Sequence, residues 1–277
     1  MANVTVTTAA AIIPEIWASE IEMAAHNVRA FTGKIQEYGF NSPGDVLHIG
    51  KIGAISAAAF SGSVSYTANT EGNVDITPDV SYAAVQIDRK ADIRAITPLG
   101  NMYQVELGES LGQYEDEQVG ALYSGLSQTV GGSSDFAEAT YLAAIGKIIN
   151  GAKNKVIMGR DPLFGAFHPA QWDHVLVVGN INSATVRGDS GAGPAKIGTI
   201  DLAYGVQLMF SHSVAVSTTA RNLIWARRAF AIARKMNPTV DVQFDPDTLS
   251  TKVVASQDFG VAELYDGLAC VYVSNAS

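Results

Sequence analysis

The chain has 277 residues, of which 47% are hydrophobic and 16% charged, and its 18 basic and 27 acidic side chains give a formal net charge of −9 at pH 7. This composition is typical of an ordered protein with one large or two modest domains, and it excludes an intrinsically disordered chain. The acidic balance argues against tight, sequence-independent binding to nucleic acid, because such binding requires Lys and Arg to neutralise phosphates.

The single cysteine and the lengths of the apolar runs exclude further classes. Cys270 lies in an apolar strand pattern at 268–273, so we expect a small buried side chain and no disulfide within the chain. The N-terminus lacks a basic segment followed by an apolar core, which predicts no secretion signal. The longest apolar runs are far below the ~20 residues that a membrane-spanning helix needs.

The chain is predicted to begin with an arm and a helix. Residues 2–12 are small and β-branched without a packing period, which indicates an extended arm. Pro14 then begins a helix that ends at Gly33. The apolar stripe of this helix consists of Ile16, Trp17, Ile21, Ala24, Val28 and Phe31.

Residues 34–88 change to strand and turn patterns. Strands are predicted at 46–49 and 80–87, and Ala, Ser, Gly, Thr and Asn dominate residues 54–73 between them. The pattern predicts two strand arms joined by a polar tip of small residues, which together form a long β-hairpin. Because an isolated two-stranded ribbon is marginally stable in water, we expect another chain to support it.

A long helix is predicted at 91–127 and a second helix at 137–152. Gly108, Gly112 and Gly120 each weaken the long helix by about 1 kcal/mol relative to Ala, and such glycines allow another backbone to approach closely. The residues at helical spacing on its apolar face are Leu107, Leu111, Tyr114, Gln118 and Leu122.

Strands and turns dominate the remainder of the chain. The predicted elements are a strand at 156–158, a strand at 166–167, a helix that begins at Pro169, a loop at 182–194, a strand pair around Tyr204-Gly205, a strand, a short helix, and a hairpin with its turn at 245–247.

Charge is unevenly distributed along the sequence. Between Ala95 and Gly146 there is no Lys or Arg, whereas Arg221 to Lys235 contains five basic residues and no acidic ones. These stretches are either two solvated faces or complementary patches that bring identical subunits together. The acidic residues of the first stretch are Glu106, Glu109, Glu115, Asp116, Glu117, Asp135 and Glu138.

Several distal motifs occur in an order known from one family. The motifs are Phe167-His168-Pro169-Ala170-Gln171-Trp172, Gly205-Val206-Gln207-Leu208, the segment 235–242, and Phe259-Gly260-Val261-Ala262 followed by a final strand at 268–273. Their order and spacing resemble the major capsid proteins of tailed bacteriophages, which have the Hong Kong 97-type fold. The resemblance implies an α+β fold with an N-arm, an extended β-hairpin loop, a spine helix, and peripheral and apical domains.

The resemblance also implies a division of the chain. The implied segments are an N-terminal arm and helix at 1–32, the extended loop at 33–90, the peripheral domain with the spine helix at 91–136, the apical domain at 137–225, the strands of the peripheral domain at 226–256, and the apical return and C-terminus at 257–277. The motifs at 259–262 and 268–273 are expected to form the final strand pair.

The implied function is structural and not enzymatic. Subunits of this kind assemble as pentamers and hexamers into an icosahedral head that encloses double-stranded DNA without sequence-specific binding. They are assembled in the host cytoplasm and reside in the virion, without a cofactor, metal or membrane. The chain lacks a long charged helical N-terminal extension, so a separate scaffolding protein is expected, together with a portal and a decoration protein. A bacterial encapsulin-like shell protein is the alternative within the same fold.

Residues of extended and charged segments are the candidate contacts between subunits. These candidates are Trp17, Asp45, Lys51, Phe60, Tyr66, Glu71, Glu109, Glu115, Arg187, Arg227, Arg228 and Arg234. Some relatives are cross-linked through a Lys of the extended loop. Lys51 is the only Lys in residues 35–89, but its place at the base of the hairpin disfavours that role.

An enzyme of another class is the second alternative. Residues 188–194 resemble the serine-nucleophile signature of chymotrypsin-like proteases, with Ser190 as the nucleophile, His26 as the base, and Asp88 or Asp92 as the carboxylate. Ala192 interrupts the expected glycine pair, and the predicted helices do not suit that fold.

Other chemical motifs are weaker. His168 and His174 lack the spacing of a helical zinc pair, and 193–199 lacks the Lys of a phosphate-binding loop. The adjacent acids at 115–117 point around their helix, which disfavours paired acid–base catalysis.

Overall fold

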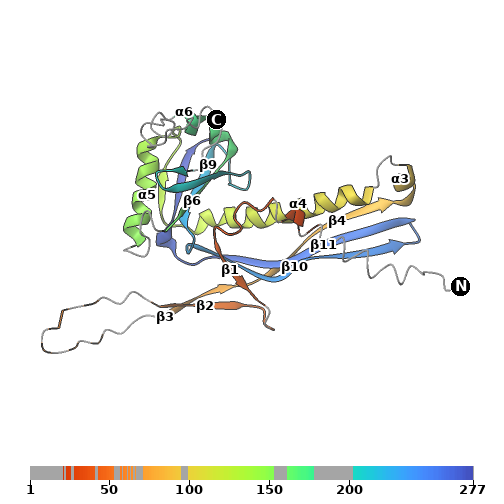
Figure 1. Ribbon diagram of the computed structural model, residues 1–277, viewed down its shortest axis with the longest axis horizontal. Coiled ribbons are helices and arrows are strands. Elements are labelled where there is room, and N and C mark those ends of the chain that lie inside the picture. The colour runs from red at the N-terminus through yellow and green to blue at the C-terminus, as the bar shows by residue number, and fades with distance from the viewer. Residues whose placement is uncertain are drawn as a thin grey trace.

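Two β-sheets, a long helix and a two-stranded hairpin organise the chain (Figure 1). The expected arm at 2–12, strand at 156–158 and loop at 182–194 lie outside the described residues. The computed structural model describes residues 21, 23–25, 28–40, 43–52, 57, 59–60, 62, 64, 66, 71–94, 99–152, 161–177 and 202–276.

A six-stranded mixed sheet with the order β5-β12-β9-β6-β8-β7 forms one part of the molecule. Its central strands are buried along almost their whole length, as expected of apolar runs covered on both faces. Helix α5 packs on β12 through one apolar face, which confirms the predicted helix. The elements are β5 (Thr129–Gly131), α5 (Glu138–Ala152), β6 (Leu163–Phe167), η2 (Pro169–Gln171), α6 (Trp172–Val177), β7 (Leu202–Ala203), β8 (Val206–Phe210), β9 (Thr219–Ala226), η3 (Asp266–Leu268) and β12 (Ala269–Asn275).

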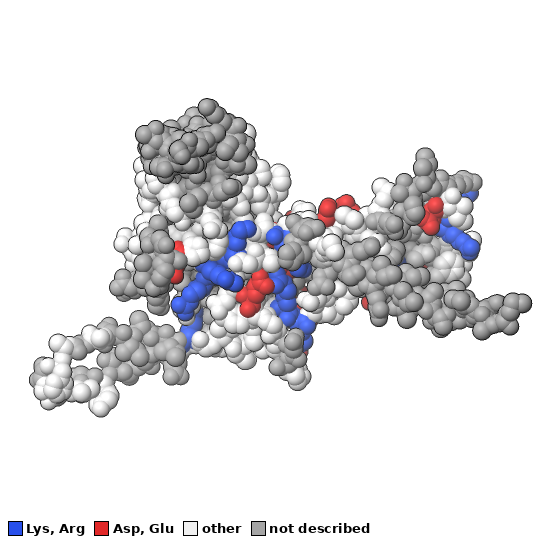
Figure 2. Space-filling view, viewed as in Figure 1, with Lys and Arg blue, Asp and Glu red and all other residues white. Residues whose placement is uncertain are grey.

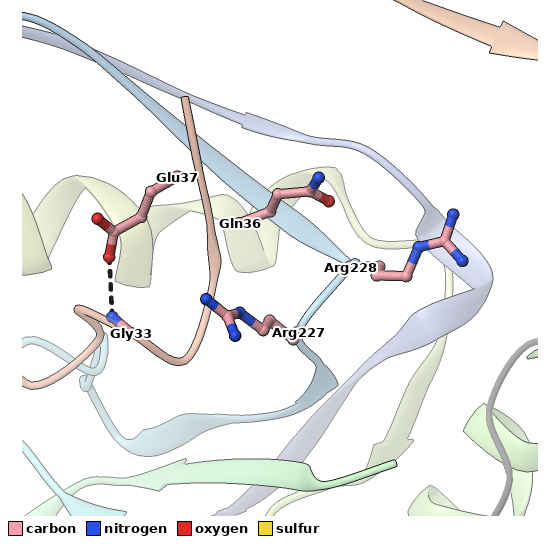
Figure 3. Close-up of a pocket in the computed structure, with 5 residues that line it drawn as sticks. All are labelled: Gly33, Gln36, Glu37, Arg227 and Arg228. Carbon is pink, nitrogen blue, oxygen red and sulfur yellow. Dashed lines mark hydrogen bonds between the residues drawn. The ribbon is translucent and has the colours of Figure 1, made fainter. Parts of the chain in front are cut away.

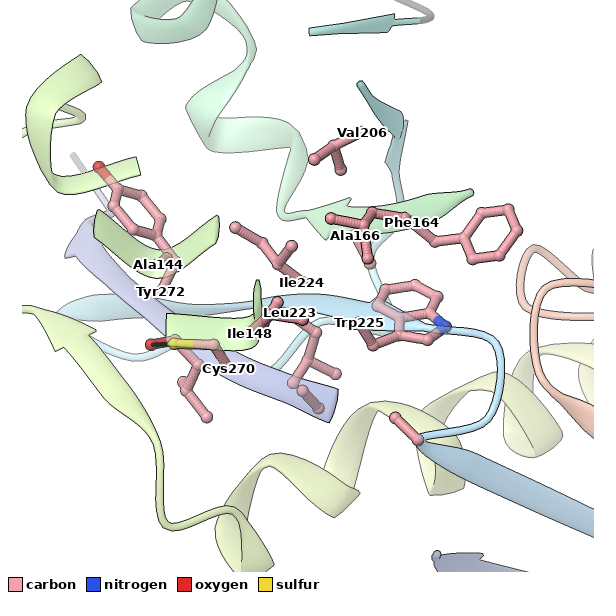
Figure 4. Packing of buried hydrophobic residues seen from close by; sticks show 14 of the residues in the cluster. Ala144, Ile148, Phe164, Ala166, Val206, Leu223, Ile224, Trp225, Cys270 and Tyr272 are labelled. Carbon is pink, nitrogen blue, oxygen red and sulfur yellow. Dashed lines mark hydrogen bonds between the residues drawn. The ribbon is translucent and has the colours of Figure 1, made fainter. Parts of the chain in front are cut away.

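The core of this part lies where α5 faces strands β6, β9 and β12 (Figure 4). Trp225 of β9 is fully buried, stacks on Phe31 at a ring distance of 5.3 Å, and donates its indole N–H to the carbonyl of Lys34 at 3.1 Å. The N-terminal segment is therefore part of the same core. Cys270 is buried as predicted, and burial raises the pKa of its thiol to about 11.

A four-stranded sheet with the order β1-β10-β11-β4 forms the elongated part of the molecule. β10 and β11 make the predicted hairpin, whose last pair is Asp245 with Ser250. Helix α4 packs along β4 and β11, and no helix of the described ranges is long and apolar enough to cross a membrane. The elements are β1 (Gln36–Gly39), β4 (Asp79–Asp88), α3 (Arg89–Arg94), α4 (Leu99–Ala121), η1 (Leu122–Gly125), β10 (Phe230–Asp245) and β11 (Ser250–Glu263).

Two glycines of α4 bring the N-terminal helix into backbone contact with it. A Cβ added at Gly108 would lie 2.6 Å from the carbonyl oxygen of Ile21, and one at Gly112 would lie 2.6 Å from that of Ala25. The predicted close approach is therefore present, but within one chain. The buried face of α4 also differs from the predicted stripe, because Tyr114 is 43% exposed while acidic residues at 115 and 116 are buried.

The hairpin is shorter than predicted, and one of its expected arms belongs elsewhere. β2 (Leu47–Ile52) pairs with β3 (Glu71–Ile76) in an antiparallel ribbon. The strand predicted at 80–87 is β4, which pairs with β11 and not with the ribbon. The base of the ribbon packs on its own chain, since Ile76 is buried against Ala231 and Leu264.

Three smaller predictions are wrong. The motif at 259–262 belongs to β11 and the one at 268–273 to β12, so they lie in different sheets and do not pair. No short α-helix occurs in residues 202–276, because β9 turns directly into the long strand β10. Val28, expected on the apolar stripe, is 36% exposed.

Candidate assembly surfaces

A cluster of charged side chains joins four parts of the chain. Arg29 Nη2 lies 2.9 Å from Glu115 Oε2, and Arg234 bonds the other oxygen of the same carboxylate. Arg234 Nη1 also lies 2.9 Å from Glu37 Oε2. The Glu115 side chain is 3% exposed and that of Arg29 is 7% exposed, so this ion pair is shielded from water, whereas the Glu37 side chain is 35% exposed. The cluster ties the N-terminal segment, β1, α4 and β10 together.

Asp116 adds a second buried carboxylate beside this cluster. Its oxygens accept the backbone N–H groups of Ala30 at 2.5 Å and Phe31 at 3.4 Å. Burial raises the pKa of Asp116 to about 6, and the charge of Glu115 adds to this effect, although the two N–H groups and Arg29 oppose it. Burial also lowers the pKa of Lys34, with Asp116 opposing the change.

These contacts change the assignment of two candidate residues. Glu115 and Arg234 were expected between subunits, but they bond each other inside the chain. The reason is the helical position of Glu115, which lies on the same face of α4 as Leu111 and Gly112. A sequence pattern that places acidic residues on the solvated face of a helix could not identify Glu115 as a buried residue.

An open pocket of about 660 Å³ lies between β1 and the turn that joins β9 to β10 (Figure 3). Its walls include Gly33, Gln36, Glu37, Arg227 and Arg228. Burial alone would raise the pKa of Glu37, but the hydrogen bond from Gly33 and the charges of Arg234 and Arg227 outweigh it and lower the pKa. Both Arg227 and Arg228 are exposed.

The base of the hairpin meets this pocket through an aromatic ring. Lys51 Nζ of β2 lies 5.1 Å from the centroid of the Tyr265 ring, and the Arg228 guanidinium lies 5.7 Å from it. Cation–π contacts of this length are attractive. Lys51 therefore has a contact within its own chain.

The remaining candidates are spread over exposed elements. Phe60 and Tyr66, between β2 and β3, are 76% and 93% exposed, which is unusual for aromatic side chains. Asp45 and Glu109 are also exposed. Glu71 is the first residue of β3, and Trp17 and Arg187 lie outside the described residues. Among the described candidates, the structure brings Glu115 and Arg234 together in the buried cluster, and Lys51 and Arg228 together at the ring of Tyr265.

The described residues of the enzyme-like motifs form no catalytic or metal-binding site. Ser190 and His26 lie outside them, while Asp88 ends β4 and Asp92 lies in α3. His168 caps η2, where its Nδ1 accepts the N–H of Ala170 at 3.2 Å. No group of three His, Cys, Asp or Glu side chains in the described ranges is placed to hold a metal ion.

Sequence reasoning missed Arg29 and Asp116, which are central to the buried cluster. One signal for Asp116 was available, because it lies four residues after Gly112 and eight after Gly108, on the face of α4 that the glycines mark as crowded. No signal of this kind marked Arg29.

No protein-family model and no curated protein matches the sequence. Solved structures do match the fold. A chain of Mycobacterium phage Che8 has 17% identity and a TM-score of 0.68 over 84% of this chain and 85% of that chain. The capsid structure of the cyanophage P-SCSP1u has 15% identity and a TM-score of 0.66 over 90% and 89%. The capsid of Ralstonia phage GP4 has 13% identity and a TM-score of 0.67 over 88% and 87%.

The chain has a Hong Kong 97-like capsid fold. The α+β class expected from the sequence is confirmed. The fold match spans 84–90% of this chain and 85–89% of the other chains in these comparisons, so it involves most of the fold rather than one shared motif. The domain boundaries stay predictions, although the boundary at 257 falls inside β11.

Proposed function

We propose that this chain is the major capsid protein of a tailed bacteriophage. In this proposal it is a structural subunit without enzymatic activity, and it assembles as pentamers and hexamers into the icosahedral head that encloses double-stranded DNA. The observation that supports this proposal is the similarity to phage capsid structures, at TM-scores of 0.66 and 0.67 over at least 87% of each chain.

The shape of the subunit supports assembly through many small contacts. The hairpin extends away from both sheets, and its tip exposes Phe60, Val64 and Tyr66 (Figure 1). Exposed apolar side chains on a projecting ribbon suit a contact with a neighbouring subunit. Each such contact is weak, but a closed shell repeats it many times, and the effective concentration of each additional contact is high.

Further partners follow from this role. A separate scaffolding protein, a portal and a decoration protein are proposed, with assembly in the host cytoplasm and a final location in the virion. Trp17, Asp45, Glu71 and Arg187 remain proposed contact residues. The acidic chain, with its net charge of −9, would enclose DNA without binding it tightly.

Electron microscopy of the purified recombinant chain after size-exclusion chromatography tests the proposal. Closed shells, tubes, or five- and six-fold rings are the expected particles. A chain that stays monomeric at high concentration, both alone and when co-expressed with its scaffolding protein, would contradict it. A Ser190→Ala variant serves as the control for the enzyme alternative, because it should assemble unchanged and no hydrolysis should depend on Ser190.

A further inference from the structure

Two arginines at the turn between β9 and β10 present exposed positive charges. Arg227 and Arg228 are exposed, and neither forms an ion pair with any described residue. Arg227 Nε donates to the carbonyl of Ile35 at 3.4 Å, and Arg228 lies over an aromatic ring. Glu37, a carboxylate in the pocket wall, is already bonded by Arg234. The described walls of the pocket therefore present a net positive charge.

A matching negative surface lies on α4. Glu106, Glu109, Gln113 and Glu117 recur at spacings of three and four residues, and all four are exposed. Glu106 and Glu109 form no ion pair with any described residue, and no Lys or Arg occurs between residues 95 and 146 to provide one locally.

Apolar side chains flank this negative surface. Met102 is 60% exposed and Val105 is 50% exposed, and both lie within one turn of Glu106. An exposed helix face that combines apolar and acidic side chains suits a subunit contact, because such contacts bury apolar area at their centre and place charged groups at their rim.

The two surfaces lie apart in one copy. Figure 2 shows Lys and Arg gathered around β1 and the start of β10 with an acidic group among them, and a separate acidic patch over α4. Both elements are fixed by buried residues, Leu111 in α4 and Trp225 in β9. A second copy can therefore supply the opposite charges that the described residues of one copy do not.

We propose that the basic pocket of Arg227 and Arg228 receives the acidic face of α4, at Glu106 and Glu109, from a second copy of this chain. The inference rests on the proposed function and specifies which surfaces join neighbouring subunits. The two surfaces are different, so the contact is heterologous, and repetition of such a contact closes into a ring when the rotation allows it.

The chemistry favours a second copy over a nucleic acid as the occupant. Arginine binds carboxylates in paired hydrogen bonds, and α4 supplies two carboxylates one helical turn apart. A phosphate backbone would face the wall carboxylate of Glu37 and a chain with a net charge of −9. Nucleic-acid binding remains a distinct outcome of the test.

Charge reversal and its reciprocal rescue test the proposal. The variants are Arg227→Glu with Arg228→Glu, Glu106→Arg with Glu109→Arg, and the four changes combined in one chain. The matched control is Arg89→Glu with Lys90→Glu, an exposed basic pair in α3. Assembly is followed by light scattering and sedimentation velocity at low and high salt, and circular dichroism confirms that each variant is folded.

Each double reversal should raise the concentration needed for assembly by about tenfold or more, since two charge pairs become repulsive. The quadruple variant should recover assembly, the control should match the original chain, and assembly of the original chain should weaken as salt increases.

Equal assembly of all variants, or no recovery in the quadruple variant, would overturn this inference while the proposed function stands. Loss of binding to double-stranded DNA in the arginine variant alone, with assembly unchanged, would assign the pocket to nucleic acid. An original chain that never assembles would overturn the proposed function itself. If the arginine reversal prevents folding, the variant Glu106→Arg with Glu109→Arg, on the exposed face of α4, tests the proposal by itself.

Discussion

Arg29 and Glu115 form an ion pair between the N-terminal segment and α4, with Nη2 and Oε2 2.9 Å apart and both side chains almost completely buried. Charges in such a place are costly unless each is compensated, and here Arg234 donates to the Glu115 carboxylate while Arg29 donates to Gln257. The pair therefore fixes where the chain enters the fold, beside the helix that spans the molecule.

Replacement of Glu115 by Gln is expected to destabilise the subunit strongly. The change leaves the buried guanidinium of Arg29 without its carboxylate, and removal of one partner from a buried pair costs about 3–5 kcal/mol. Urea unfolding followed by circular dichroism measures the difference in unfolding free energy. The matched change Glu117→Gln, on the exposed face of the same helix, should cost less than about 0.5 kcal/mol. Similar losses in both variants would show that the cluster contributes little.

Asp116 should make stability depend on pH in an unusual direction. Its pKa in the folded chain is about 6, above its ordinary value of 3.8, so the folded state binds more protons between these values. The contribution of this group to the unfolding free energy is therefore largest at low pH and is lost as pH rises through about 6.

An Asp116→Asn variant isolates this contribution, because other carboxyls such as Glu37 and Asp245 have lowered pKa values and act in the opposite direction. Between pH 4 and pH 7, the stability of the original chain relative to the variant should fall by up to about 3 kcal/mol. Urea titrations of both proteins at several pH values provide the difference. A difference that increases with pH would mean that the N–H groups of Ala30 and Phe31 outweigh burial.

Gly112→Ala tests the close contact between the N-terminal helix and α4. The new Cβ would lie 2.6 Å from the backbone oxygen of Ala25, so one helix must shift, at a cost of about 1–3 kcal/mol. The melting temperature should fall accordingly. Gly146→Ala is the control, because the added Cβ meets nothing within 4 Å and alanine is the better helix former by about 1 kcal/mol. A rise in melting temperature for both variants would contradict the contact.

Local sequence patterns predicted individual helices, turns and strands well, but they predicted long-range strand pairing poorly. The helix at 138–152, the turn at Tyr204-Gly205 and the hairpin of β10 and β11 follow from periodicity and turn residues, which act over a few positions. The pairing partner of β4 does not follow from such a pattern, because the alternation of exposed and half-buried residues in β4 suits the arm of a ribbon and the edge of a sheet equally.

The candidate contact residues show the same difference between local and long-range features. Exposure of Arg227, Arg228 and Glu109 was expected from charge runs, which indicate solvated surfaces. The burial of Glu115 and Arg234 depends on partners 86 or more residues away, Arg29 for one and Glu37 for the other, and no local pattern specifies such partners.

The tip of the hairpin can be removed without touching its paired strands. Ile52 and Glu71 are the last register pair of β2 and β3, so residues 53–70 can be replaced by Asn-Gly, which favours a two-residue turn. The base remains anchored through Ile76, so the melting temperature should change little. Stable shells should be lost, because the exposed Phe60 and Tyr66 are removed with the tip. A Gly-Ser segment of the same length in place of 53–70 separates the loss of reach from the loss of these aromatic contacts. Normal particles from both variants, viewed by electron microscopy, would rule out the interlocking role proposed for the hairpin.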